Sequence, residues 1–112
     1  MHISYDELTF GVAVEGRDGD AVVVFRGELD LGAVVQLQDC IDRVASHGRP
    51  LTMDLSGVTF MDSSGINILL RARHARGADP DAVTIRSPSD AVVATLEMAG
   101  LTRMFRTVDG AA

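Results

Sequence analysis

The chain alternates between short apolar runs and segments with the apolar spacing of a helix, and this alternation limits the folds open to it. Residues 21–25 read Ala-Val-Val-Val-Phe, a continuous run typical of a strand buried on both faces of a helix-covered sheet. Val34, Leu37 and Ile41 then recur at three and four residues, which predicts a helix over 33–46. Strands that alternate with helices over short connections pair in parallel, so the pattern predicts an α/β fold.

A hairpin and two further alternations complete the expected order of elements. Before residue 21, the sequence predicts a first strand over 8–14 and a hairpin turn over 15–20. After the first helix it predicts a strand over 51–55, a loop over 56–62 and a helix from Ser63 to Gly77. A strand over 83–85, a helix that opens at Ser87–Asp90 and ends at Gly100, and a last strand over 104–108 follow. We therefore predict one α/β domain over residues 1–112, with its core over about 8–108. Its sheet should be mixed and mostly parallel, with four to five strands in βαβ order.

Charge and composition exclude several classes of function. The chain has sixteen acidic residues, ten arginines and no lysine, so its net charge is −6. The missing lysine excludes Schiff-base chemistry, a phosphate loop that ends in Gly-Lys-Ser/Thr and a receiver-type phosphoaspartate at Asp54. Asp54 alternates with Met53 and Leu55 in its strand, so we expect it to bond a loop or a helix end. An acidic chain without a basic stripe is not expected to bind nucleic acid.

Neither a membrane nor a secretory role is expected from the sequence. The N-terminal residues have no basic start and no long apolar stretch, and the longest apolar run, residues 21–25, is far shorter than a membrane-spanning helix needs. We therefore expect a cytoplasmic protein that does not bind a membrane.

Catalysis, metals and cofactors are also not expected. Cys40 is the single cysteine, and His2, His47 and His74 are scattered, so no metal site is predicted. Ser63 lacks the preceding glycine of a nucleophile elbow, and His74 lies roughly 15 Å further along the same helix. We therefore predict that the protein is not an enzyme and has no cofactor.

Two polar segments should meet at the carboxyl edge of the sheet, where ligands and partners approach α/β folds. One is Gly27-Glu28-Leu29-Asp30, and the other is Met61-Asp62-Ser63-Ser64-Gly65 at the start of a helix. Free backbone N–H groups at a helix N-terminus favour negative charge, so Ser63 can carry a phosphate at low structural cost. The same residue types are also ordinary helix caps, and the motif alone leaves both interpretations open.

A resemblance over about residues 8–108 favours the phosphate interpretation. The resemblance is carried by Gly27-Glu28-Leu29-Asp30, Met53-Asp54-Leu55-Ser56, the run Val58-Thr59-Phe60-Met61-Asp62-Ser63-Ser64-Gly65-Ile66, Ser87-Pro88 to Leu96, and Gly100-Leu101 with Phe105. Together these blocks resemble the STAS domain of bacterial anti-sigma factor antagonists. The resemblance implies a single STAS domain that acts by partner switching.

In such a switch the unphosphorylated antagonist binds an anti-sigma factor, itself a serine kinase, and thereby releases the sigma factor. The resemblance implies that this kinase phosphorylates Ser63, that phosphorylation abolishes binding, and that a serine phosphatase restores the active form. Ser64 ranks second as acceptor. The partner-binding residues would be Asp30, Asp62, Ser64, Gly65 and Asn67.

Several points stay open. The same resemblance allows an accessory or scaffold module without sigma-factor regulation, of a transporter-associated, stressosome-like or ligand-sensing and nucleotide-sensing kind. Ala33-Val34 stands where many relatives have Thr-Ala, which removes one usual helix cap, and Ile66-Asn67 stands where many have Leu-Gly or Leu-Arg. A monomer or weak dimer is expected. An apolar face for docking, some of which belongs equally well in the core, would comprise Leu29, Leu31, Val58, Phe60, Met61 and Ile66.

Overall fold

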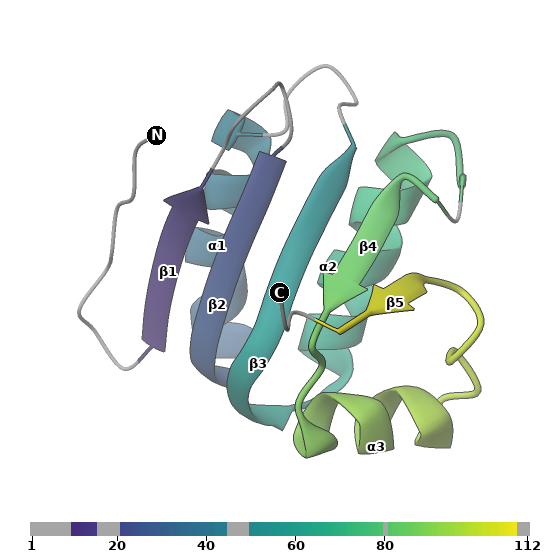
Figure 1. The fold of residues 1–112 in the computed structure, drawn as a ribbon. Coiled ribbons are helices and arrows are strands. Elements are labelled where there is room, and N and C mark those ends of the chain that lie inside the picture. The colour runs from purple at the N-terminus through teal and green to yellow at the C-terminus, as the bar shows by residue number, and fades with distance from the viewer. Residues whose placement is uncertain (1–9, 16–20, 45–49, 80, 110–112) are drawn as a thin grey trace.

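Strands and helices alternate along the residues that the computed structural model describes, 10–15, 21–44, 50–79 and 81–109. In chain order the elements are β1 (Phe10–Glu15), β2 (Ala21–Leu29), α1 (Leu31–Val44), β3 (Leu51–Met61), α2 (Ser63–Ala75), β4 (Val83–Arg86), α3 (Asp90–Met98) and β5 (Arg106–Val108). The five strands form one sheet in the order β1-β2-β3-β4-β5 (Figure 1). β1 pairs antiparallel with β2 and the other neighbours pair in parallel, which confirms the predicted fold class.

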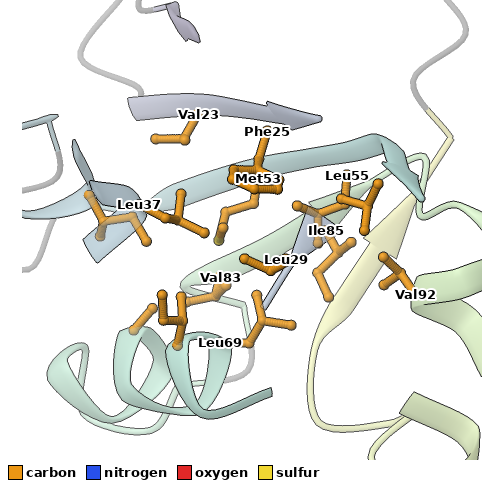
Figure 2. Packing of buried hydrophobic residues seen from close by; sticks show 14 of the residues in the cluster. Val23, Phe25, Leu29, Leu37, Met53, Leu55, Leu69, Val83, Ile85 and Val92 are labelled. Carbon is orange, nitrogen blue, oxygen red and sulfur yellow. The ribbon is translucent and has the colours of Figure 1, made fainter. Parts of the chain in front are cut away.

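Helices α1 and α2 lie on one face of the sheet, and α3 lies at the edge where β3 ends (Figure 1). The core fills the space between the sheet and these helices. Residues 37 and 41 of α1 and 68, 69 and 72 of α2 turn inward, at the spacing that places side chains on one helix face. Figure 2 shows this packing from close by, with labelled side chains from β2, β3 and β4 and from all three helices.

Among the described residues, helices cover one face of the sheet and not both (Figure 1), so one prediction for residues 21–25 is wrong. Ala21, Val23 and Phe25 are buried, whereas Val22 and Val24 are only half-buried. Side chains alternate across a strand, and α1 and α2 share the face to which the odd-numbered residues point. An unbroken valine run predicts a strand well, but it does not show whether the second face is covered.

β2 and β3 continue well beyond their predicted ends. The expected loop over 56–62 is strand as far as Met61, and β2 includes Gly27, Glu28 and Leu29. The two strands change register between Val24 and Arg26 and again between Gly27 and Glu28. These irregularities break the alternation of apolar and polar residues, so the strand pattern disappears from the sequence while the pairing continues.

Gly57 explains how the strands stay close at the first irregularity. A Cβ atom at this position would lie 2.7 Å from the Cβ of Arg26 on the neighbouring strand. Any larger residue would collide with Arg26 and push β2 and β3 apart at this point.

The predicted helix starts agree better with the structure. α2 begins at Ser63, as predicted, and α3 begins at Asp90 after a cap by the Ser89 hydroxyl, which accepts from the Val92 N–H at 3.3 Å. α1 begins at Leu31, two residues before its predicted start. Of the hairpin turn predicted over 15–20, Glu15 ends β1 and residues 16–20 lie outside the described residues, but the antiparallel pairing that the turn requires is present.

Candidate functional site

The ends of β2 and β3 bring Asp30 and Asp62 side by side. Leu29 and Met61 are the last register partners of the two strands, and the two aspartates follow them directly. The Asp62 N–H donates to the Leu29 carbonyl at 3.5 Å, which continues the ladder one step further. Neighbouring strands lie about 4.8 Å apart, so the two motifs found in the sequence meet at one edge of the sheet.

Each aspartate caps the helix that follows it. Asp30 Oδ1 accepts a hydrogen bond from the Ala33 N–H at 3.2 Å, and Asp62 Oδ1 accepts one from the Ser64 N–H at 2.9 Å. Both aspartates are half-buried. α1 therefore has a side-chain cap although Ala33 carries no polar side chain, because Asp30 supplies the acceptor.

Ser63 is the first residue of α2 and is exposed. Among the described residues its hydroxyl has no hydrogen-bond partner, because the Asp62 carboxylate is directed to the next residue, Ser64. The Asp62 carbonyl accepts from the N–H groups of Gly65 and Ile66 at 3.1 and 3.3 Å. The Ser63 hydroxyl is thus accessible at the N-terminal, positive end of a helix. The backbone before it is fixed by the hydrogen bonds of the Asp62 N–H and carbonyl groups.

Gly65 lies beneath this surface. It is buried, and a Cβ atom there would lie 2.6 Å from Met61 Cγ and 3.0 Å from Leu29 Cγ. The missing side chain lets α2 pack directly on the ends of β2 and β3. Gly65 therefore sets the distance between the helix and the sheet at the site, and its predicted part in partner binding stays a prediction.

A groove of about 440 Å³ runs between α1 and α2 and reaches Ser64, the residue after Ser63. Ser64, Asn67 and Arg71 line it from α2, and Leu31 and Val35 line it from α1. Asn67 is exposed, one turn after Ser63, and its predicted part in partner binding stays a prediction. Leu31 and Val35 are large apolar side chains with 73% and 74% of their surface exposed, so the groove has an apolar rim.

The predicted apolar docking face is only partly on the surface. Leu31 and Phe60 are exposed, the latter by 47%, whereas Leu29, Val58 and Met61 belong to the core. Ile66 is partly buried against the same core. Val35 was not predicted as part of this face. The helix was predicted to begin at residue 33, so Leu31 and Val35, four residues apart, were not recognised as an exposed pair on one helix.

Residues 12–107 match the family model described as MlaB, STAS domain. The chain belongs to the STAS domain family. STAS domains of this kind are typically binding modules and not enzymes.

Relatives and solved structures extend this assignment. A STAS-domain-containing protein of Pseudomonas aeruginosa is 27% identical over 95 residues, which cover 84% of this chain and 94% of that protein. The crystal structure of an anti-sigma factor antagonist from Mycobacterium paratuberculosis is 28% identical, with a TM-score of 0.77 over 88% of this chain and 85% of that one. The unphosphorylated form of the anti-sigma factor antagonist SpoIIAA shares the fold, with 23% identity and a TM-score of 0.72 over 89% and 88% of the two chains.

Asp54 of this STAS domain has a structural role away from the site. Its carboxylate accepts from the Ser56 N–H and hydroxyl at 3.0 and 2.7 Å and from Arg86 Nε at 2.9 Å. Burial alone would raise the pKa of the Asp54 carboxyl, but the bonds from Ser56 and the Arg86 guanidinium outweigh it and lower that pKa. The prediction that Asp54 bonds a loop or a helix end was wrong, because its partner Arg86 belongs to the adjacent strand β4 and its partner Ser56 belongs to β3 itself.

Other chemistry has little support in the described part of this STAS domain. Cys40 is half-buried on α1, and burial raises the pKa of its thiol, which makes it less reactive. Among the described residues, no group of three histidine, cysteine or carboxylate side chains could hold a metal ion. The helices of the described segments are too short or too polar to span a bilayer.

Proposed function

We propose that this STAS domain is an anti-sigma factor antagonist that works by partner switching. The unphosphorylated form binds an anti-sigma factor with serine kinase activity and releases the sigma factor, and phosphorylation at Ser63 ends that binding. A serine phosphatase then restores the active form. The switch operates in the cytoplasm, and the protein acts as a monomer or weak dimer.

The observation that carries this proposal is the exposed Ser63 hydroxyl at the first residue of α2, directly after the capping residue Asp62. It lies on a fold that matches an anti-sigma factor antagonist with a TM-score of 0.77. SpoIIAA, which shares the fold, has been solved in both an unphosphorylated and a phosphorylated form, so this fold accommodates a phosphate.

Electrostatics explains how one phosphate would end binding without unfolding the domain. A phosphoserine adds about −1.5 to −2 charges at neutral pH, beside Asp62 and across the strand pair from Asp30. In the free protein, water and the helix N-terminus offset that repulsion. In a complex the phosphate would lose water without a prepared cation, which costs on the order of 3 kcal/mol, or more than a hundredfold in affinity.

The surroundings of Ser63 suit a protein partner in the unphosphorylated state. Leu31 and Val35 offer exposed apolar area beside the serine, and Asn67 and Arg71 offer polar contacts along the same groove. Exposed apolar side chains next to polar ones are common in protein interfaces.

A second candidate is an accessory module without sigma-factor regulation, of the transporter-associated kind. It is favoured by the matching family model, whose description is that of MlaB and not of a sigma-factor regulator. In this case the same surface would bind a partner that does not phosphorylate Ser63. Phosphorylation therefore distinguishes the two candidates.

The test uses purified wild-type protein, Ser63→Asp and Ser63→Ala as bait in an extract of the source cell. We expect wild-type and Ser63→Ala protein to retain a serine kinase that Ser63→Asp loses, and ATP to label wild-type protein but not Ser63→Ala. Thr102→Asp adds the same charge at an exposed position on the loop after α3 and should keep the kinase. An identical set of partners for wild-type and Ser63→Asp bait, or labelling of Ser63→Ala, would overturn the proposal.

A further inference from the structure

A side chain of helix α3, Thr95, reaches the end of β3 at the site. Its hydroxyl oxygen lies 3.0 Å from the carbonyl oxygen of Met61, the residue at which β3 ends. It also lies 2.9 Å from the carbonyl of Ala91, one turn back in its own helix. Helical serines and threonines commonly make the second kind of bond, whereas the first joins elements that are 34 residues apart in the chain.

Met61 begins the segment that presents the acceptor serine, residues 61–65, which we name the acceptor turn. The turn is held at its strand end by the Asp62 N–H, whose bond to the Leu29 carbonyl is long at 3.5 Å. On the helix side Gly65 packs closely on the strand ends, where an added Cβ would lie 3.0 Å from Leu29 Cγ. Among the described residues, no side chain outside the turn other than Thr95 hydrogen-bonds to it.

We propose that Thr95 is a positioning residue for the acceptor turn, and that its bond to the Met61 carbonyl fixes the direction in which the Ser63 hydroxyl points. This inference rests on the proposed function, in which Ser63 accepts a phosphoryl group. Phosphoryl transfer needs the attacking oxygen in line with the leaving group, and a displacement of about 1 Å can cost a hundredfold in rate. A side chain that never touches the kinase would therefore affect the chemical step.

The position of Thr95 in α3 supports a specific role. The helix buries Val92 and Leu96 against the sheet, and Thr95 is half-buried at the border of that contact. A valine would fill the same volume at this place without the hydroxyl. The Thr95 hydroxyl therefore adds a directional hydrogen bond to the end of β3, which apolar packing alone would not give.

The test compares Thr95→Val, which keeps the shape and removes the donor, with Thr95→Ser, which keeps the donor. Amide hydrogen exchange is measured residue by residue in both variants and in the wild-type protein. We expect the Ser64, Gly65 and Ile66 amides to exchange about three- to tenfold faster in Thr95→Val, the range that loss of one hydrogen bond gives. Amides of β2 and β4 should change less than about twofold, and Thr95→Ser should restore the wild-type values.

Unchanged exchange in the acceptor turn would overturn the inference. So would a uniform rise over all strands, because Thr95 would then stabilise the whole fold and not position the turn. A rise confined to α3 would show that only the bond to Ala91 matters, and it would overturn the inference equally.

A kinetic measurement adds a readout that a purely structural role would not move. The three proteins are phosphorylated with ATP and the kinase fraction of the source cell that labels the wild-type protein. We expect kcat to fall about fivefold or more in Thr95→Val with KM within about twofold, and Thr95→Ser to recover, because positioning acts on the chemical step. A raised KM with an unchanged kcat would overturn positioning. If wild-type protein is not labelled at Ser63, the proposed function fails, while hydrogen exchange still decides whether Thr95 holds the turn.

Discussion

The two turns that lead from strand to helix at the carboxyl edge of the sheet are alike in backbone and different in what they expose. Asp30 and Asp62 follow register partners, each caps the next helix, and each is half-buried. The first residue of α1 is Leu31, an exposed apolar side chain, whereas the first residue of α2 is Ser63, an exposed hydroxyl. A capping aspartate therefore says little about function, and the residue after it says much more.

A pair of glycines offers the largest expected difference between the turns. Gly32 and Gly65 both lie in the first turn of their helices, so alanine brings each the same gain in helix propensity, up to about 1 kcal/mol. A Cβ at Gly32 would lie 3.4 Å from Asp30 Oδ1, an ordinary contact, whereas one at Gly65 would lie 2.6 Å from Met61 Cγ. We expect Gly65→Ala to lower the free energy of unfolding by about 1–3 kcal/mol and Gly32→Ala to leave it unchanged or raise it.

Urea unfolding followed by circular dichroism measures both values under the same conditions. Equal effects of the two substitutions would show that α2 does not pack on the strand ends as closely as the structure indicates.

The second-largest expected effects on stability come from the two aspartates that cap α1 and α2. Loss of an N-cap aspartate typically costs about 1 kcal/mol, so Asp30→Ala and Asp62→Ala should lower the free energy of unfolding by similar amounts. Their effects on phosphorylation by the proposed kinase should differ, because only Asp62 is covalently next to Ser63, the proposed acceptor. We expect the rate of Ser63 phosphorylation to fall more in Asp62→Ala than in Asp30→Ala. Asp→Asn variants, which keep a capping oxygen, serve as controls for stability.

A reversed order of the two rates, measured at a temperature where both variants are folded, would contradict this prediction. Asp30 would then contribute more than Asp62 to recognition by the kinase.

Asp54 sharpens the comparison, since it is an aspartate of β3 that caps no helix and instead pairs with Arg86. Its carboxyl pKa is lowered in the folded protein, so its contribution to stability is present above the unfolded value of about 3.9 and is lost as pH falls through the folded value. We expect Asp54→Asn to cost below about 1 kcal/mol at neutral pH, because part of each side chain is exposed.

Unfolding of wild-type and Asp54→Asn protein between pH 7 and pH 3 tests the sign. The difference between them should shrink as the solution is acidified below about pH 4. A difference that grows on acidification would mean that the carboxyl pKa is raised.

The sequence was enough for the order of elements and for the placement of Ser63 at a helix start. Parallel pairing follows from alternation alone, and the aspartate with two serines predicts a helix N-terminus by capping chemistry. The true lengths of β2 and β3 were not predictable in the same way, because the register changes near Gly27 and Gly57 destroy the period of two. The groove and Thr95 depend on which helix faces meet, and a single sequence does not specify that.

The smallest expected effect is the one on which the proposed switch depends. A negative charge at the first residue of a helix is stabilised by about 0.3–1 kcal/mol, and at Ser63 the neighbouring carboxylate of Asp62 offsets that gain. We therefore expect Ser63→Asp to change the free energy of unfolding by less than about 0.5 kcal/mol. Leu31→Asp places the same charge at the first residue of α1, next to Asp30, and should also be nearly neutral because Leu31 is exposed. If Ser63→Asp instead lowered the free energy of unfolding by more than about 1 kcal/mol in urea, loss of the partner would reflect damage to the fold. With both values near zero, a lost partner reflects charge at the interface, which is what distinguishes a switch from an unfolded variant.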